Sequence, residues 1–226
     1  MWAMSEEVEL AAKATGEVVA ALAEESGALS IPKEYARYVA ARIHHRLYPR
    51  LVASAIDAAE KIRASGLPQR AFGELDEPLL TAILEGMAEE ADPDLQKCWQ
   101  NLLANMLVSQ WGVKRTFPNL LRGLEPPEIA ALDRLANRTA GAPQWTQFRP
   151  MEQLGDGLQQ LSIENLVALG ILRPSPDQSR TEWEEREGGA TTETMSVLEF
   201  THMGLAFVKA CRPPHGPTVV AVHSLG

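Results

Sequence analysis

Apolar residues recur at helical spacing along most of the chain. Between residues 5 and 25 they form one alanine-rich face, and from Tyr35 to Leu51 a second stripe repeats every four residues. Pro32 stands where a helix favours proline, at its first position. Pro49 is expected to kink or split this second helix, because proline cannot continue the hydrogen-bond ladder. The pattern then resumes and stops at Gly66-Leu67-Pro68.

Two more helices are predicted behind acidic start signals. Asp76-Glu77-Pro78 opens one and Asp92-Pro93-Asp94 opens the next, since an aspartate cap followed by proline is typical of a helix start. The segment from Leu95 to Leu107 is the strongest amphipathic pattern in the chain, and the short connection before it predicts an antiparallel helix pair. Residues 117–124 are expected to form a short helix before the next boundary.

The pattern changes at Glu125-Pro126-Pro127-Glu128, which we interpret as the start of a second unit. The elements expected from there on are helices at 129–136, 151–154 and 163–169, a strand at 171–172, a polar loop near 174–195, a returning strand at 197–200 and a helix capped by Thr201. This order of helices, paired strands and a final helix is that of a winged helix.

The chain is therefore predicted to be mostly α-helical, with helical hairpins or a bundle over residues 1–124. A small winged-helix-like α+β unit follows over 125–212, with a mobile acidic loop near 174–195. Residues 213–226 form a C-terminal tail.

Composition narrows the class of protein. The 226 residues are 45% hydrophobic and 23% charged, with a formal net charge of −9, so nucleic acid is an unlikely partner for the whole surface. The two cysteines, Cys98 and Cys211, cannot form a disulfide framework, and we expect buried free thiols. The sequence starts without the pattern of a signal peptide, and we expect a cytoplasmic protein.

No catalytic motif is complete. Gly155-Asp156-Gly157 lacks the third glycine of a dinucleotide loop, and Ser30 with Lys33 fits a helix cap better than a nucleophile pair. His44 and His45 are adjacent, so on a helix they would point about 100° apart and could not share a metal. The acidic cluster 182–187 is typical of solvated charge. We expect no enzyme activity, no cofactor, no metal and no small-molecule substrate.

One charge feature is informative. Between Ser30 and Ser65 seven basic and three acidic residues give a local charge of +4. Arg42, Arg46 and Arg50 recur every four residues, with His45 beside them, and are predicted to form one ridge. This ridge is our candidate partner-binding site, suited to an acidic protein surface, phosphates or an anionic membrane surface. The alternative is an exposed face balanced by acidic helices elsewhere in the fold or in a partner subunit.

The winged-helix-like unit is poorly suited to DNA. Its candidate recognition helix, 162–169, contains no basic residue, and the loop in the wing position is acidic. We interpret the unit as a protein-interaction or dimerisation element. The alanine-rich face of residues 5–25 permits close helix approach, which suits an oligomer.

Three passages carry a family resemblance, and they appear in order along the chain. They are Trp99-Gln100-Asn101-Leu102-Leu103-Ala104-Asn105, then Phe117-Pro118 with Leu124 to Glu128, and finally Asn165 to Leu172 with Phe200 to Phe207 and Ala210-Cys211. Together, over residues 35–212, they resemble the abortive-infection alpha family of bacterial proteins. Phe117 and Phe200 depart from the histidine and leucine usual there. The resemblance implies a role in phage resistance and carries no catalytic residues with it.

The sequence thus predicts a non-enzymatic phage-defence protein that acts by self-association or by binding another protein. A winged-helix DNA-binding regulator and a membrane-active effector are the alternatives.

Overall fold

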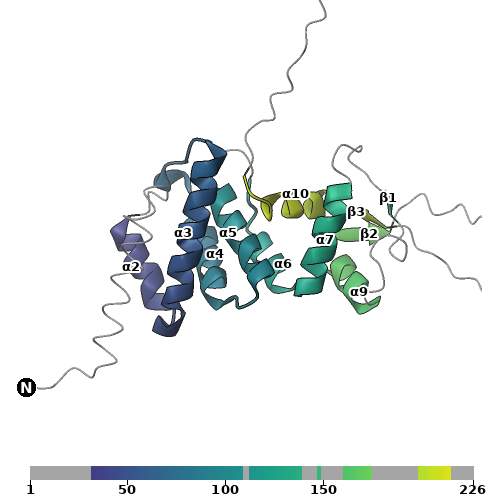
Figure 1. Ribbon diagram of the computed structural model, residues 1–226, viewed down its shortest axis with the longest axis horizontal. Helices are drawn as coiled ribbons and strands as arrows, with labels where there is room; N and C mark the ends of the chain where they lie inside the picture. Colours follow the sequence, from purple (N-terminus) through teal and green to yellow (C-terminus); the bar gives the residue numbers. More distant parts are fainter. Residues whose placement is uncertain (1–31, 109–111, 139–146, 149–159, 175–197, 215–226) are drawn as a thin grey trace, which may run out of the picture. The chain divides into compact units, whose positions relative to one another are not determined.

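The computed structural model describes residues 32–108, 112–138, 147–148, 160–174 and 198–214 (Figure 1). Within these ranges the chain is mostly helical, with one small antiparallel sheet, as predicted. The helices expected at 5–25 and 151–154, the acidic loop after residue 174 and the tail after residue 214 lie outside the described residues.

The chain divides into two compact units. Unit 1 consists of residues 1–122 and 210–226, and unit 2 consists of residues 123–209. The predicted boundary at 124/125 lies close to the point between residues 122 and 123 where the chain passes from unit 1 to unit 2. Residues 210–212, which the sequence pattern assigns to the winged-helix-like unit, group with unit 1.

Unit 1 is built on helices packed around an apolar core. Its described elements are α2 (Lys33–Arg42), the 3-10 turn η2 (His45–Leu47), α3 (Tyr48–Ser65), the 3-10 turn η3 (Phe72–Glu74), α4 (Glu77–Glu89), α5 (Pro93–Leu107) and α6 (Phe117–Arg122). Helices α3, α4 and α5 pack against one another. Helix α5 lies deepest, because from Cys98 to Leu107 every residue is buried, including the indole of Trp99.

The long second helix is split, as Pro49 predicts, but the break comes before the proline. Ile43 and His44 are extended, with ψ angles of 134° and 132°, and η2 leads into α3, where Pro49 occupies the first turn. A proline ring clashes with the carbonyl four residues earlier, which here belongs to His45. The helix therefore ends upstream and starts again with the proline in a tolerated position.

The predicted caps of α4 and α5 are confirmed. The carboxylate of Asp76 accepts from the backbone N–H of Leu79 at 3.2 Å. Asp92 accepts from Asp94 and Leu95 at 2.9 and 3.0 Å. Each aspartate satisfies N–H groups that have no partner inside the helix, which fixes where the helix begins.

Unit 2 combines helices with a three-stranded sheet. Its described elements are α7 (Pro126–Arg138), β1 (Gln147–Phe148), α9 (Gln160–Ala168), β2 (Leu172–Pro174), β3 (Leu198–Phe200) and α10 (His202–Ala210). The strands are antiparallel in the order β1-β3-β2, with Glu199 of β3 opposite both Gln147 and Arg173. Strand β1 was not predicted, because two residues are too few to show an alternating pattern. The winged-helix assignment stays a prediction.

Candidate functional site

The four residues of the predicted ridge do not lie on one helix. Arg42 is the last residue of α2, His45 and Arg46 belong to η2, and Arg50 lies in the first turn of α3. Residues four apart share a face only on a continuous helix. Because the helix ends at Arg42, the expectation of a single helical ridge was wrong. Whether these residues bind a partner is a separate matter.

Two of the four side chains are engaged within unit 1. The Nε of Arg42 lies 2.6 Å from Glu85 Oε1 on α4, and its guanidinium stacks over the Tyr38 ring, 5.6 Å from its centre. The hydrogen bond that Arg42 donates to Glu85 raises the pKa of Arg42. Arg50 donates to the carbonyls of Ala88 and Glu89 at 3.4 and 3.1 Å. These carbonyls end α4 and have no partner inside that helix.

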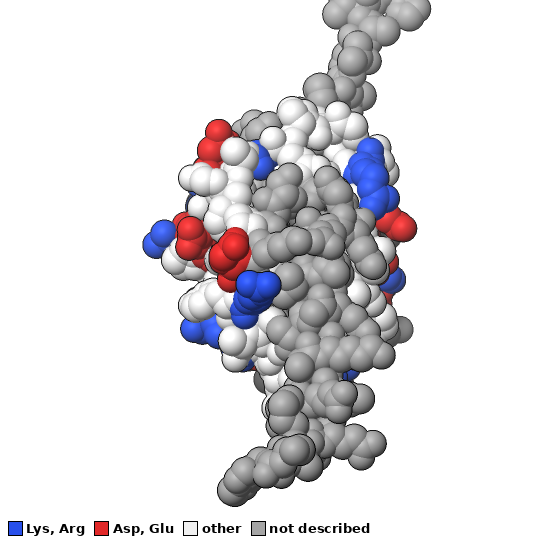
Figure 2. All heavy atoms as spheres, turned by 90° about the vertical axis from the view of Figure 1, so that its left-hand side faces the viewer, with Lys and Arg blue, Asp and Glu red and all other residues white. Residues whose placement is uncertain are grey.

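The pair between Arg42 and Glu85 matches the alternative interpretation, in which acidic groups elsewhere in the fold balance the basic face. Figure 2 looks onto the side of the molecule where α2 lies, and basic and acidic side chains are interspersed there rather than gathered into one basic stripe. Within unit 1, Arg42 and Arg50 therefore hold α2 and α3 against α4.

Arg46 and His45 differ from the two engaged arginines. Arg46 is exposed, and its guanidinium makes no hydrogen bond or ion pair with the part of the chain that the structure describes. The rings of His44 and His45 stack with centres 4.5 Å apart, contrary to the divergence expected on a helix. His44 Nδ1 accepts from the Arg46 backbone at 3.3 Å and so caps η2.

A second group of polar residues was missed by the ridge argument, and it lies on α5. We call Asn101 and Asn105 the amide pair. Asn101 donates to the Cys211 carbonyl at 2.7 Å, and Asn105 donates to the carbonyls of Ala210 and Arg212 at 2.9 and 2.7 Å. The signal in the sequence is a pair of amides one turn apart among the apolar residues of α5.

The amide pair is deeply buried, with exposed fractions of 5% and 1%. The Oδ1 atoms of both amides have no hydrogen-bond partner among the residues described. Leaving a buried polar atom unpaired costs free energy. The amide nitrogens donate to four backbone carbonyls, those of Cys211, Ala210, Arg212 and Asn101, and these bonds must contribute enough to keep both side chains inside.

Gln100, the residue before Asn101 on α5, links that helix to α3 through a chain of polar side chains. Lys61 Nζ donates to Gln100 Oε1 at 2.7 Å, and Gln100 Nε2 donates to Asp57 Oδ2 at 2.9 Å. Burial lowers the pKa of Lys61, while the charges of Asp57 and then Cys98 act in the opposite direction. Both cysteines are free, as predicted, although Cys211 is only partly buried.

Unit 2 contains its own polar anchor, which we call the Glu128 joint. The Glu128 carboxylate accepts from the Glu125 backbone N–H at 2.8 Å and from Asn165 Nδ2 at 3.0 and 3.1 Å. Asn165 also donates to the Gly123 carbonyl at 2.9 Å. Glu128 is 2% exposed, so the joint fastens the start of α7 to α9 inside unit 2.

The passage into α10 depends on close backbone approach. Thr201 Oγ1 donates to the Gly170 carbonyl at 2.5 Å and accepts from the Gly204 N–H at 2.8 Å. Gly170 has a φ of 69°, in the left-handed region that favours glycine after a helix. A Cβ on Gly204 would run into the backbone carbonyl of Ile171. These residues fix a tight junction between α9, β2 and α10.

A scan against protein-family models matches residues 50–211 to the family described as abortive infection alpha. This chain belongs to that family. The match confirms the resemblance seen in the sequence, although it begins at residue 50 rather than 35. Arg42, His45 and Arg46 therefore precede the matched region. Searches of the curated proteins and of the solved structures found no match.

Membership of this family suggests a role in phage defence by abortive infection. The structure shows where the residues of the matching passages lie. Asn101, Asn105, Asn165, Glu128 and Thr201 all occur in the passages that carried the resemblance. Each one bonds backbone or a neighbouring side chain inside its unit. Among the described residues, no group of three or more histidine, cysteine or carboxylate side chains is placed to hold a metal. In the same ranges, no helix combines the length and hydropathy needed to cross a membrane.

Proposed function

We propose that this abortive infection alpha protein defends bacteria against phage as a non-enzymatic binding protein in the cytoplasm, by associating with a second copy or with another protein. The observation that carries this proposal is what the polar side chains in the matched passages bond to. The polar side chains in the passages that carry the resemblance make hydrogen bonds that stabilise the fold. A group held in such bonds is not free to attack or protonate a substrate.

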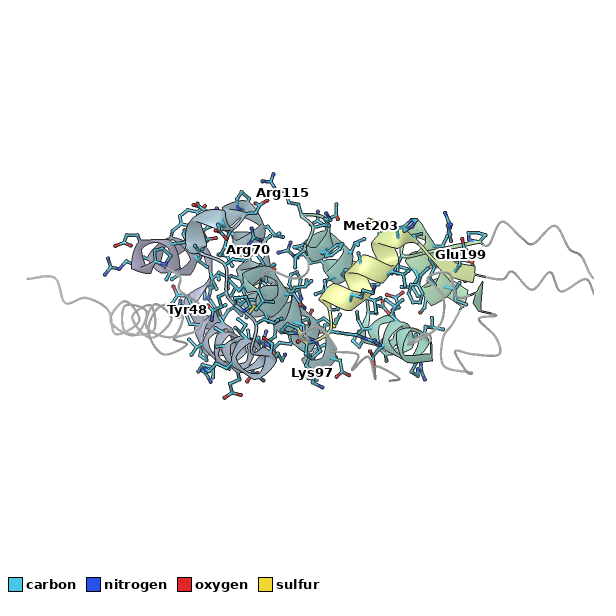
Figure 3. All side chains as sticks on the ribbon, turned by 90° about the horizontal axis from the view of Figure 1, so that it is seen from above. Tyr48, Arg70, Lys97, Arg115, Glu199 and Met203 are labelled. Carbon is cyan, nitrogen blue, oxygen red and sulfur yellow. The ribbon has the colours of Figure 1, made fainter. Side chains whose placement is uncertain are left out.

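The charges of unit 2 favour protein over DNA as the partner. Asn165, the asparagine of α9, is directed to Gly123 and Glu128 rather than outward. Arg173 of β2 is paired with Glu199 of β3 at 2.6 Å; Figure 3 labels Glu199. Side chains that would reach bases or phosphates from these elements are thus already neutralised or engaged.

Within the predicted ridge, Arg46 with His45 is the part that remains available. Arg42 and Arg50 make contacts that hold unit 1 together, so their replacement would report on stability as well as on binding. Arg46 makes no such contact within the described residues. It is therefore the residue at which partner binding can be tested separately from folding.

The test compares Arg46→Glu with Arg134→Glu in cells challenged with phage. Arg134 is also exposed, but it lies on α7 of unit 2, so the control has the same charge change away from the candidate surface. We expect Arg46→Glu to reduce protection and to lower the solution mass of the assembly measured by light scattering, and Arg134→Glu to leave both unchanged. Equal behaviour of the two variants removes Arg46 from the binding surface.

The binding mechanism itself is tested by native purification of the wild-type chain from protected cells. A mass above that of one chain, or a companion protein at fixed ratio, is expected. A chain that travels alone from cells that are fully protected would contradict the proposal.

A further inference from the structure

Helix α2 is packed on one side and open on the other. Ala36, Val39 and Ala40 are fully buried in the core of unit 1. The exposed residues recur at helical spacing along the opposite side, and we call them the α2 stripe: Glu34, Arg37, Tyr38, Ala41 and Arg42. Among the described residues, only Tyr38 and Met203 are large hydrophobic side chains that stay exposed, at 52% and 38%. The α2 stripe is therefore a helix face with an exposed aromatic ring at its centre.

The ring of Tyr38 is held in place by its neighbours. The guanidinium of Arg42 lies over it, 5.6 Å from the ring centre, and donates to its hydroxyl at 3.3 Å. The ring centre of Tyr35 is 6.0 Å away, and Tyr35 in turn meets the edge of Phe72 at 5.1 Å. A side chain that is already ordered loses little entropy when it is covered. Tyrosine and arginine are also the residue types that contribute most often to binding energy.

The charge of the stripe points to an acidic occupant. Arg37 and Arg42 outnumber Glu34 on it, and the Arg37 guanidinium makes no hydrogen bond or ion pair within the described ranges. Residues 1–31 lead directly into α2, and they contain six glutamates and one lysine, so that one minus six gives a net charge of −5. The chain that precedes α2 and the open side of α2 are thus complementary in charge.

The preceding chain also has the length and the pattern to lie along α2. Apolar residues at helical spacing predict one apolar face over residues 5–25. Residues 26–32 connect this segment to α2, and a short connection favours antiparallel neighbours. The connection reaches at most about 25 Å, whereas α2, with ten residues, is about 15 Å long. A segment tethered this closely has a local concentration on the order of millimolar, so it has an advantage over a partner in solution.

We propose that residues 5–25 fold back along α2 of the same chain and cover the α2 stripe. The apolar face of the segment then lies on Tyr38 and Ala41, and its glutamates face Arg37. The contact is internal to one chain, so it goes beyond the proposed binding function and holds whether or not Arg46 binds a partner. A partner that used this side of α2 would first have to displace the segment.

Hydroxyl-radical footprinting of the full chain, read by mass spectrometry, tests whether Tyr38 is covered. The labelling rate of each side chain is divided by its rate in the denatured chain. Met203, labelled in Figure 3, is the internal reference because it lies in unit 2 and is also exposed. We expect Tyr38 to be labelled several-fold more slowly than its exposure on α2 alone would allow, and Met203 to be labelled freely.

Charge variants show whether the segment provides the cover. Arg37→Glu gives the stripe the sign of the segment, and we expect Tyr38 labelling to rise several-fold. The triple variant Glu17→Lys, Glu24→Lys, Glu25→Lys is expected to have the same effect, and combining it with Arg37→Glu is expected to restore protection. Arg63→Glu, at an exposed arginine in the last turn of α3, is the control with unchanged labelling.

A dilution series of the wild-type chain distinguishes the possible occupants. A contact within one chain protects Tyr38 equally at every concentration. Protection that disappears on dilution would assign the stripe to a second copy and overturn the proposal, as would Tyr38 labelling that is as fast in the wild type as in Arg37→Glu. The dilution series and the glutamate variant decide the question even if Arg37→Glu fails to fold. No arm uses phage protection as its readout, so failure here is distinct from failure of the proposed function.

Discussion

Each unit uses buried polar side chains to hold separate segments of the chain together, but the side chains differ in chemistry. In unit 1 the amide pair holds backbone carbonyls through neutral donors, and the bonded residues are 105 to 110 positions apart in sequence. In unit 2 the Glu128 joint uses a carboxylate, and its partners are at most 42 positions apart. The amide pair leaves two buried oxygens unpaired among the described residues, whereas both oxygens of Glu128 are bonded.

The difference teaches where each unit is vulnerable. Unit 1 depends on a few long-range bonds in its deepest helix. Unit 2 depends on bonds formed by segments close in sequence, one of them assisted by charge. Substitutions at the amide pair and at the Glu128 joint therefore test what determines the loss of stability. It is set either by the burial and sequence separation of the bonded groups or by the strength of each hydrogen bond.

The largest effect is expected at the amide pair. Asn105→Ala leaves the carbonyls of Ala210 and Arg212 buried without their donor, and we expect a loss of about 3 kcal/mol in the free energy of unfolding. Chemical denaturation measures the loss. The control is Asn119→Ala, an exposed asparagine on α6, with little expected change.

Hydrogen exchange then locates the damage. Faster exchange in α5 and in residues 210–212, with β2 and β3 still protected, would support separate anchoring of the two units. Equal loss of protection in both units would contradict that comparison.

The next effect is expected at the tight junction of unit 2. Gly204→Ala places a methyl group against the Ile171 carbonyl, which belongs to the backbone and cannot easily give way. Overpacking of this kind costs about 2 kcal/mol. Gly73→Ala is the matched control, because nothing lies within 4 Å of the Cβ it would add. Thermal unfolding of the two variants, followed by circular dichroism, checks the difference; equal melting temperatures would refute it.

A smaller effect is expected at the Glu128 joint. Glu128→Gln keeps the shape but removes the charge that strengthens the bonds from Glu125 and Asn165, and about 1 kcal/mol is expected to be lost. Glu125→Gln changes an exposed carboxylate three residues away and is the control. Denaturant midpoints measured side by side decide the matter, and a larger loss than at Asn105 would reverse the comparison of the two anchors.

The smallest effect concerns pH. The hydrogen bond from Arg115 lowers the pKa of Asp76, the cap of α4. A carboxyl whose pKa is lower in the folded chain stabilises the fold above its ordinary pKa, and that contribution is lost as the pH falls through the folded value. Arg115→Met is expected to move the pKa of Asp76 back upward, as followed by carboxyl NMR titration. An unchanged titration would show that the backbone bond to Leu79 alone sets the pKa.

Local interactions were the part of this fold that the sequence could reveal. Asp76 and Asp92 bond N–H groups two or three residues away, so their caps are visible in a short window. The family passages could also be recognised from order and spacing. Strand β1 could not be predicted from the sequence, because its two residues gain their conformation from pairing with β3, far along the chain.

The site was harder to predict for the same reason. Nothing near Asn101 or Asn105 in sequence indicates residues 210–212 as their partners. The prediction of one helical ridge is wrong because the ring of Pro49 acts on the turn before it. Spacing by four places Arg42, Arg46 and Arg50 on one face only if the helix is continuous, and the backbone leaves the helix at Ile43.

The return of the chain to unit 1 at residue 210 imposes an order on synthesis. The carbonyl that Asn105 holds is made 105 residues later, which at about 5–20 residues per second takes a ribosome on the order of 5–20 s. For that time α5 has emerged without its final partners, while all of unit 2 is still being made. A chain truncated anywhere before residue 210 would lack the backbone carbonyls of residues 210–212, and the amide pair would be left without these acceptors.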